Sequence, residues 1–432
     1  MSTVRLVEGA VPAAARPTLL PRAQAARVFL AFALAYFIST LLRAVTATLA
    51  PVLSEEMQLR ASDLGLLAGG YFLGFALTQL PLGTLLDRYG PRKVILVFLA
   101  VAVAGCAGFA LASEFAGLLV ARVVVGMGVS ACLMAPLTGY RRWLRPELQL
   151  RANAWMLMTG SMGTVASTLP VQWLMPVTGW RGIFWVLALM LVLSMLIIAC
   201  TVPAWSSGSA SPAARPAAPG RPPMSYGDIW RHPYFRMMVP VGLVNYGGML
   251  AVQTLWAGPW MVRVGGASAE VAAVGLFGIS LCLLIAFWLW GVVTPALARR
   301  GISTERLIGI GMPLSLLALA AAIVLGPAAG WPYWAAFCVS CTCASLAQPA
   351  VAMAMPAQAA GRALSAYNLA IFSGVFMAQW GIGLAIDGLQ GLGWSVVASF
   401  RGAMGLYLLA SALAYALFLS GWNRVRRAKL VT

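Results

Sequence analysis

The stretch that decides the fold is Gly83-Thr-Leu-Leu-Asp87-Arg88-Tyr-Gly90-Pro91-Arg92-Lys93, a short break between two long apolar segments. It places one carboxylate, three cations and two glycines in a single turn. Charged residues are costly beside a bilayer, and they persist there mainly when they are paired or functional. An ordinary positively charged loop would account for the cations, but not for Asp87 or the glycine spacing. We therefore interpret this stretch as functional.

The composition around this stretch is that of a membrane protein. Of the 432 residues, 61% are hydrophobic and 9% are charged, whereas a soluble domain has about 25% charged residues. A spanning helix needs about 20 predominantly apolar residues. Twelve segments qualify, and their continuous apolar runs predict helices instead of a barrel. They are residues 27–50, 63–86, 93–113, 115–139, 153–175, 181–201, 236–262, 269–293, 305–326, 331–353, 363–385 and 399–421.

The distribution of positive charge predicts the topology. A net charge of +18 would suggest a nucleic-acid partner in a soluble protein. With the N-terminus placed in the cytoplasm, however, all but six of the 29 Lys and Arg residues fall on the cytoplasmic side, and the six are Arg43, Arg60, Arg122, Arg181, Arg263 and Arg401. This bias follows the positive-inside rule. It predicts both termini in the cytoplasm, a bacterial inner membrane location, and no nucleic-acid partner.

A change in composition divides the chain into two halves. Residues 203–235 are rich in Pro, Ala, Gly and Ser, which predicts a cytoplasmic linker. The predicted organisation is therefore a tail (1–26), six helices (27–202), the linker (203–235), six helices (236–421) and a second tail (422–432). A faint repeat supports duplication, because Leu86-Asp87-Arg88-Tyr89-Gly90 aligns with Leu297-Ala298-Arg299-Arg300-Gly301 after the second helix of each half.

The opening stretch also resembles the loop between the second and third helices of the major facilitator superfamily, whose pattern is Gly-x-x-x-Asp-Arg-x-Gly-basic-basic. The chain matches it at Gly83, Asp87, Arg88 and Gly90, departs at Pro91, and supplies Arg92 and Lys93 one step later. Arg122-x-x-x-Gly126-x-Gly128 and residues 179–184 extend the resemblance over nearly the whole chain, excepting the tails and linker.

The resemblance implies an all-α fold of twelve transmembrane helices in two pseudo-symmetric six-helix bundles, working by alternating access. It implies that the loop residues Gly83, Asp87, Arg88, Gly90, Arg92 and Lys93 latch the cytoplasmic side of the two halves. Arg122 occupies the position of a family arginine associated with proton coupling or internal gating, and we favour a structural or gating role over substrate contact. Gly160-x-x-Gly163 lacks the Gly-Pro signature of proton-driven drug antiporters, which argues against drug efflux.

A polar stripe on the first helix is the sharpest candidate for substrate binding. Tyr36, Ser39, Thr40, Arg43 and Thr46 recur at steps of three or four residues along an apolar helix. Facing lipid would cost Arg43 from ~3 to above ~10 kcal/mol, so it should face a water-filled cavity. Its guanidinium suits a carboxylate, sulfonate or phosphate. The alternative is a structural tie to carbonyl groups of a neighbouring helix.

Further candidates lie in the second half. Asn245, Met249, Gln253, Trp256 and Trp260 would share one face of the seventh helix, with Tyr246 beside it, and amides and aromatic rings can bind and stack on a substrate. Asn368 and Gln379 on the eleventh helix are counterparts, although polar contacts between helices explain them nearly as well. We single out Asn245, Gln253, Trp256 and Asn368 with Tyr36, Thr40 and Arg43.

The acidic residues constrain the energetics of transport. All eleven lie in loops or near the ends of predicted helices, so none is placed as a proton carrier deep in the membrane. Importing one net negative charge against an inside-negative potential costs ~2.3 kcal/mol per 100 mV. An anion importer would therefore need a co-transported proton or other cation, or a counter-transported anion. No mid-membrane carboxylate supplies the coupling, although a rim acid could.

These observations together predict a monomeric secondary transporter, embedded in the lipid bilayer, that moves a small organic anion. The alternative is exchange or efflux of neutral or cationic amphipathic compounds. No enzyme activity, cofactor or metal site is predicted, because the sequence shows no nucleophile–base or metal-ligand constellation. The substrate itself does not follow from the sequence.

Overall fold

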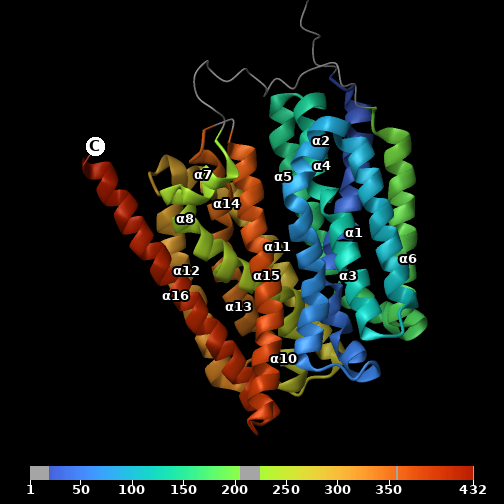
Figure 1. The fold of residues 1–432 in the computed structure, drawn as a ribbon, viewed down its shortest axis with the longest axis vertical. Helices are drawn as coiled ribbons and strands as arrows, with labels where there is room; N and C mark the ends of the chain where they lie inside the picture. Colours follow the sequence, from blue (N-terminus) through green and yellow to red (C-terminus); the bar gives the residue numbers. More distant parts are fainter. Residues whose placement is uncertain (1–18, 205–223, 357–358, 432) are drawn as a thin grey trace, which may run out of the picture.

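The computed structural model describes residues 19–204, 224–356 and 359–431, and their regular structure is helical (Figure 1). The first half contains α1 (Arg22–Glu56), α2 (Ala61–Leu111), α3 (Phe115–Val129), α4 (Ala131–Trp143), α5 (Pro146–Ala166) and α6 (Leu169–Thr201). The second half contains α7 (Tyr226–Arg231), α8 (Pro233–Pro240), η1 (Val241–Tyr246), α9 (Gly247–Ala251), η2 (Val252–Trp256), α10 (Ala257–Arg263), α11 (Ala269–Arg299), α12 (Thr304–Leu325), η3 (Gly326–Ala328), α13 (Trp331–Cys341), η4 (Thr342–Leu346), α14 (Ala347–Met353), α15 (Ala360–Gly391) and α16 (Val396–Val431).

Two glycines resolve the number of membrane crossings. Ten helices of the described residues are long and apolar enough to span a membrane. Within α2, Gly90 has φ 77° and ψ 164°, and within α6, Gly179 has φ 64° and ψ 173°, so each element consists of two helices joined by a sharp turn. Side chains disfavour this left-handed region, which explains glycine at both turns. The break at Gly90 divides α2 into two crossings instead of one. The break at Gly179 separates the start of α6, which together with α5 forms a further crossing. The ten spans thus become twelve, and the twelve predicted helices are confirmed.

Most helices extend beyond the predicted apolar windows. α1 begins at Arg22 and ends at Glu56, compared with the predicted 27–50, and α16 continues from Val396 to Val431, through most of the segment expected to be a C-terminal tail. A hydropathy window detects only the part of a helix that lies in hydrocarbon, whereas helical hydrogen bonding continues into the polar interface. Most of the predicted N-terminal tail (1–26) and linker (203–235) lies outside the described residues.

The described end of the segment predicted as a linker forms the short helix α7 (Tyr226–Arg231). Ser225 caps it, since the Ser225 hydroxyl accepts from the backbone N–H of Asp228 at 3.2 Å. The Asp228 carboxylate in turn accepts from the Ser225 backbone N–H at 2.8 Å, which completes a capping box. These hydrogen bonds lower the pKa of the exposed Asp228 carboxyl. Pro233 then begins α8, the first part of the seventh crossing.

The first six crossings lie on one side of the molecule and the last six on the other (Figure 1). We call the end that holds the start of α1 and the end of α16 the inner end, since the charge distribution predicts it to face the cytoplasm, and the opposite end the outer end. Within the first half, α2 and α3 cross closely: a Cβ on Gly126 would lie 1.9 Å from the Tyr71 carbonyl oxygen, and one on Gly74 2.0 Å from that of Val123. Small residues at such crossings let backbones approach in a membrane.

Candidate functional site

Arg43 lies in the middle of α1 with its side chain partly exposed. Its Nε atom is buried and has no hydrogen-bond partner within residues 19–204, 224–356 and 359–431. An ion pair in the described part of the chain joins Arg181 and Glu56 at the outer end, and it does not involve Arg43. A guanidinium that is neither paired nor fully solvated is poised to accept an anionic partner.

Phenol groups from both halves lie within electrostatic range of this guanidinium. Arg43 is close enough to act electrostatically on Tyr36 in α1, on Tyr71 in α2 and on Tyr246 in the opposite half. The Tyr71 hydroxyl donates to the Ser39 carbonyl oxygen at 3.0 Å, which fixes its ring against α1. Tyr36 and Tyr246 are partly exposed, as is Arg43. These three groups, from both halves, are therefore within electrostatic range of one another.

Contact between α1 and α10 sets the depth of Gln253 relative to Arg43. A Cβ on Gly258 would lie 2.8 Å from the Ala47 carbonyl oxygen, so these two residues are at the same level. Both helices run from the inner to the outer end, and four residues span about 6 Å of an α-helix. Arg43 lies four residues before Ala47, and Gln253 lies five residues before Gly258. The two residues are therefore at a similar depth. Gln253 is partly exposed, and its segment η2 contacts α1, so it lies at the depth of Arg43 on a neighbouring helix.

The seventh crossing, Pro233–Arg263, contains two π-helical turns that the sequence did not indicate. They are η1 (Val241–Tyr246) and η2 (Val252–Trp256), and between them they hold four of the polar and aromatic residues singled out on this helix. Single π-helical turns within α-helices occur frequently at functional sites. Each turn shifts the residues beyond it around the helix axis, so side chains expected on one face point in different directions.

Three of the predicted residues are buried within the second half. The Asn245 amide donates to the Ser411 carbonyl oxygen at 3.0 Å, and the Trp256 indole N–H donates to the Gln379 carbonyl oxygen at 3.1 Å. Asn368 accepts a hydrogen bond from the Gln348 amide. All three side chains are at most 5% exposed. Their polar groups bond within the second half, and a role for them in substrate binding stays a prediction.

Thr40 is also buried. Its hydroxyl donates to the Tyr36 and Phe37 carbonyl oxygens of its own helix, at 3.2 and 3.0 Å. It packs against Gly163, where a Cβ would lie 2.2 Å from the Thr40 hydroxyl oxygen. A Cβ on Gly160 would lie 2.4 Å from the Tyr36 ring. Close packing of α5 on α1 thus fixes both side chains, and only Tyr36 remains partly exposed.

Arg122 is enclosed by aromatic rings in the first half. Its side chain is 1% exposed, and its guanidinium carbon lies 5.5 Å from the ring centroid of Phe109, 5.8 Å from that of Phe184 and 6.0 Å from that of Tyr71. Cation–π attraction partly offsets the cost of burying the charge. Its Nη1 donates to the Leu42 carbonyl oxygen at 3.2 Å, next to Arg43. This arrangement ties α3 to α1, and the structural or gating role of Arg122 stays a prediction.

The charged turn between the second and third crossings lies at the inner end. Gly83, Asp87, Arg88 and Lys93 are exposed, Gly90 makes the turn, and Arg92 donates to the Ala199 carbonyl oxygen at the end of α6. Arg141 of α4 acts electrostatically on Asp87. All of these contacts are within the first half, so the latch between halves stays a prediction.

The sequence did not predict the aromatic contacts between the two halves. The Phe372 ring centroid lies 4.4 Å from that of Phe75 and 6.2 Å from that of Phe72, so α15 and α2 meet through stacked and tilted rings. In the sequence these residues look like ordinary apolar positions of spanning helices. Gln348, the partner of Asn368, was missed because an isolated amide carries no spacing signal.

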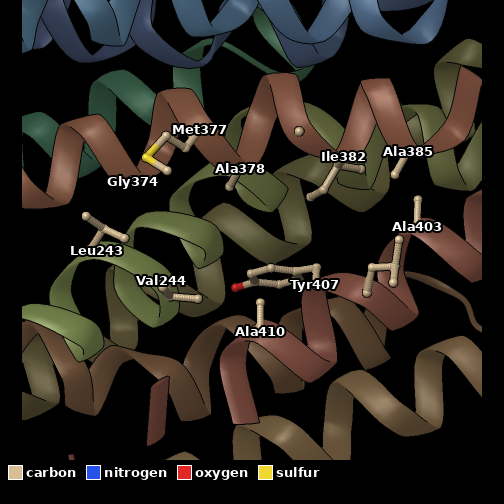
Figure 2. Close-up of a pocket in the computed structure, with 12 residues that line it drawn as sticks. Leu243, Val244, Gly374, Met377, Ala378, Ile382, Ala385, Ala403, Tyr407 and Ala410 are labelled. Carbon is tan, nitrogen blue, oxygen red and sulfur yellow. The ribbon is translucent and has the colours of Figure 1, made fainter. Parts of the chain in front are cut away.

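The pocket in Figure 2 does not include Arg43 or the other predicted site residues. It has a volume of about 260 Å³, and it is lined by side chains from η1, α15 and α16, with Tyr407 lying across its middle. Its lining is otherwise apolar and includes none of the predicted site residues. An anion needs positive or hydrogen-bonding groups around it, so this pocket is not the candidate site.

The comparisons with known proteins agree with this architecture. A model of the Major Facilitator Superfamily matches residues 32–379. The chain belongs to the major facilitator superfamily. It is thus a multi-pass membrane transporter and not an enzyme, and transporters of this superfamily carry small molecules, often with proton coupling.

Two curated relatives of this superfamily member carry anions by name. The chain is 28% identical over 159 residues to the probable sulfoacetate transporter SauU of Cupriavidus necator, covering 36% of each chain. It is 28% identical over 144 residues to the galacturonate transporter of Dickeya chrysanthemi, covering 33% of this chain and 42% of the relative. The matches thus span less than half of either relative.

Among solved structures, the superfamily member is similar to a bacterial homolog of the human lysosomal transporter Spinster in an inward-facing and unoccupied conformation. The TM-score is 0.76 at 18% sequence identity, covering 93% of this chain and 98% of the other. This likeness establishes the fold shared by the two proteins.

Proposed function

We propose that the protein is a secondary transporter for a small organic anion, with Arg43 as the fixed positive charge of its binding site. The observation that carries this proposal is the partly exposed Arg43, whose buried Nε has no hydrogen-bond partner among the described residues and which lies within electrostatic range of phenol groups from both halves. Carboxylate and sulfonate groups bind a guanidinium through paired, charge-assisted hydrogen bonds. The names of the sulfoacetate and galacturonate transporters support this substrate class.

Gln253, Tyr36 and Tyr246 complete the proposed site. An amide and two phenols can donate to or accept from hydroxyl groups of a substrate, and Gln253 lies at a similar depth to Arg43. A site of this kind favours a compact anion that carries further polar groups over a bulky apolar one. Thr40, Asn245, Trp256 and Asn368 then act behind it, by holding the helices that carry the exposed groups.

The proposed cycle uses the two halves as moving units, residues 27–202 and 236–421, in a bacterial inner membrane with both termini in the cytoplasm. The loop residues from Gly83 to Lys93, together with Arg122, govern the conformational equilibrium. The acids of the described spans lie near their ends, so charge balance comes from anion exchange, from a proton carried with the substrate, or from a rim acid.

Counterflow with purified protein tests the proposal. Proteoliposomes loaded with one unlabelled compound are diluted into its trace-labelled form, with sulfoacetate, galacturonate and galactonate as anions and galactose as the matched neutral sugar. We expect accumulation of at least one anion and none of galactose. Accumulation of galactose or of a cationic amphipath, with no anion accumulated under any pH gradient, would contradict the proposal.

A further inference from the structure

The two halves meet along an antiparallel seam between α2 and α15. A Cβ on Gly65 would lie 2.3 Å from the Gln379 carbonyl oxygen, and one on Gly383 would lie 2.4 Å from the Ala61 carbonyl oxygen. A Cβ on Gly69 would lie 2.9 Å from the Phe376 ring. The seam thus runs from the outer end to the middle of the membrane, and it is built largely from backbone in direct contact.

Asp387 lies at the outermost point of this seam. Its carboxylate belongs to α15 in the second half, and it accepts from the backbone N–H of Ala61 at 3.1 Å and from that of Ser62 at 2.8 Å. These are the first two residues of α2, whose N–H groups have no acceptor within their own helix. Among the hydrogen bonds of the described residues, these two join one half to the other.

The position of this carboxylate is electrostatically favourable. The N-terminus of a helix carries a partial positive charge, and a carboxylate that accepts from its free N–H groups stabilises it. Asp63 provides a comparison within the same turn, since its carboxylate accepts from the Arg60 backbone N–H at 3.1 Å. Asp63 therefore caps α2 from inside the first half, whereas Asp387 caps the same helix from the other half.

We propose that Asp387 is the latch of the outer gate, a residue that sets the balance between the two access states of the transport cycle. The close seam keeps the outer end shut, and any opening there must separate α15 from the start of α2. Such a separation takes the Asp387 carboxylate away from both N–H groups and leaves them to water. The latch therefore favours the state that is closed at the outer end.

This proposal rests on alternating access between the halves and not on the identity of the substrate. It also differs from the role implied for Asp87, which lies at the inner end. The first helix of α2 begins at Ala61 and ends at Gly90. Asp387 contacts its outer end from the other half, and Asp87 lies near its inner end. Loss of the outer latch should thus favour outward opening, even for a protein that moves no anion at all.

Thiol labelling in right-side-out membrane vesicles tests the latch without a substrate. The parent carries Ser at Cys200 and Cys282, the two cysteines that are not fully buried, and a reporter cysteine at the partly exposed Gln253. A membrane-impermeant maleimide is added from outside. We expect Asp387→Ala to raise the labelling rate about tenfold, because two hydrogen bonds to a charged group are lost. Asp387→Asn, which keeps an acceptor oxygen but loses the charge, should raise it by a smaller factor.

Asp63→Ala is the matched control. It removes a carboxylate cap from the same helix turn, so it should lower thermal stability while leaving the outside labelling rate within about twofold of the parent. If Asp387→Ala does not reach the membrane, Asp387→Asn decides the question. A labelling rate equal to the parent in the folded Asp387 variants, or an equal increase in Asp63→Ala, would overturn the proposal.

Discussion

Replacing Arg43 by Gln should abolish tight anion binding while leaving the fold intact. Gln keeps a polar side chain of similar reach at a partly exposed position, so the packing around α1 changes little. What is lost is the fixed positive charge and the paired donors of the guanidinium. Because Arg43 is not part of an ion pair found in the described residues, its removal leaves no carboxylate uncompensated there. The variant therefore isolates the contribution of charge.

The size of the effect follows from Coulomb's law. Two unit charges about 4 Å apart attract by ~4 kcal/mol at an effective dielectric constant of about 20. Arg43 is partly exposed, and solvent screening reduces this attraction, so we expect a loss of about 2–3 kcal/mol. Every ~1.4 kcal/mol is a tenfold change in Kd, which gives a weakening of roughly 30- to 150-fold. Arg43→Lys should recover only part of it, because an ammonium cannot reproduce the planar fork.

The assay is equilibrium binding of the best anion from the counterflow panel to purified protein in lipid nanodiscs. Arg401→Gln is the matched control, since Arg401 is an outer-end arginine that donates to the Ile323 and Val324 carbonyl oxygens. It removes the same net charge far from the site and should change Kd by less than about twofold. An Arg43→Gln protein that binds the anion with a Kd within twofold of the parent would refute the assignment.

Three further outcomes are expected. Gly126→Ala should lower the free energy of unfolding by about 1–3 kcal/mol, and the melting temperature by several degrees, because the new Cβ would lie 1.9 Å from a carbonyl oxygen. Gly405→Ala is the matched control, since a Cβ there has no neighbouring atom within 4 Å among the described residues, and it should leave the melting temperature unchanged. Asp87→Asn should lower turnover and change thiol accessibility at the two cavity mouths, and normal values of both would count against the inner latch. Counterflow should proceed without ATP, since the sequence has no nucleotide-binding phosphate loop; strict dependence on ATP would rule out a gradient-driven mechanism.

The fold could be predicted from the sequence because each crossing leaves a local signal. Hydrocarbon thickness fixes the length of every apolar run, and Gly90 and Gly179 stand where the chain must turn sharply between two of them. The ends of α1 and α16 could not be predicted, since helical hydrogen bonding continues where the apolar signal stops. Hydropathy reports the surrounding solvent and not the backbone conformation.

The candidate site was only partly predictable, for a geometric reason. The face expected on the seventh crossing assumed 3.6 residues per turn throughout, but η1 and η2 interrupt this period. Asn245 and Trp256 therefore donate to neighbours within their own half, and Gln253 stays accessible. Arg43 could be identified because a charge inside an apolar helix is expensive wherever it points. Asp387 could not, because its partners are backbone groups 325 and 326 positions away.

The division of labour among the helices has an evolutionary consequence. The gate is made by α2 and α15, largely from backbone atoms and glycines, while the proposed recognition groups lie on α1 and on the Pro233–Arg263 crossing. Substitutions that change what is recognised can therefore accumulate on one pair of helices without altering how the halves close. Proteins with this arrangement can therefore evolve to bind new substrates while they keep the same gate.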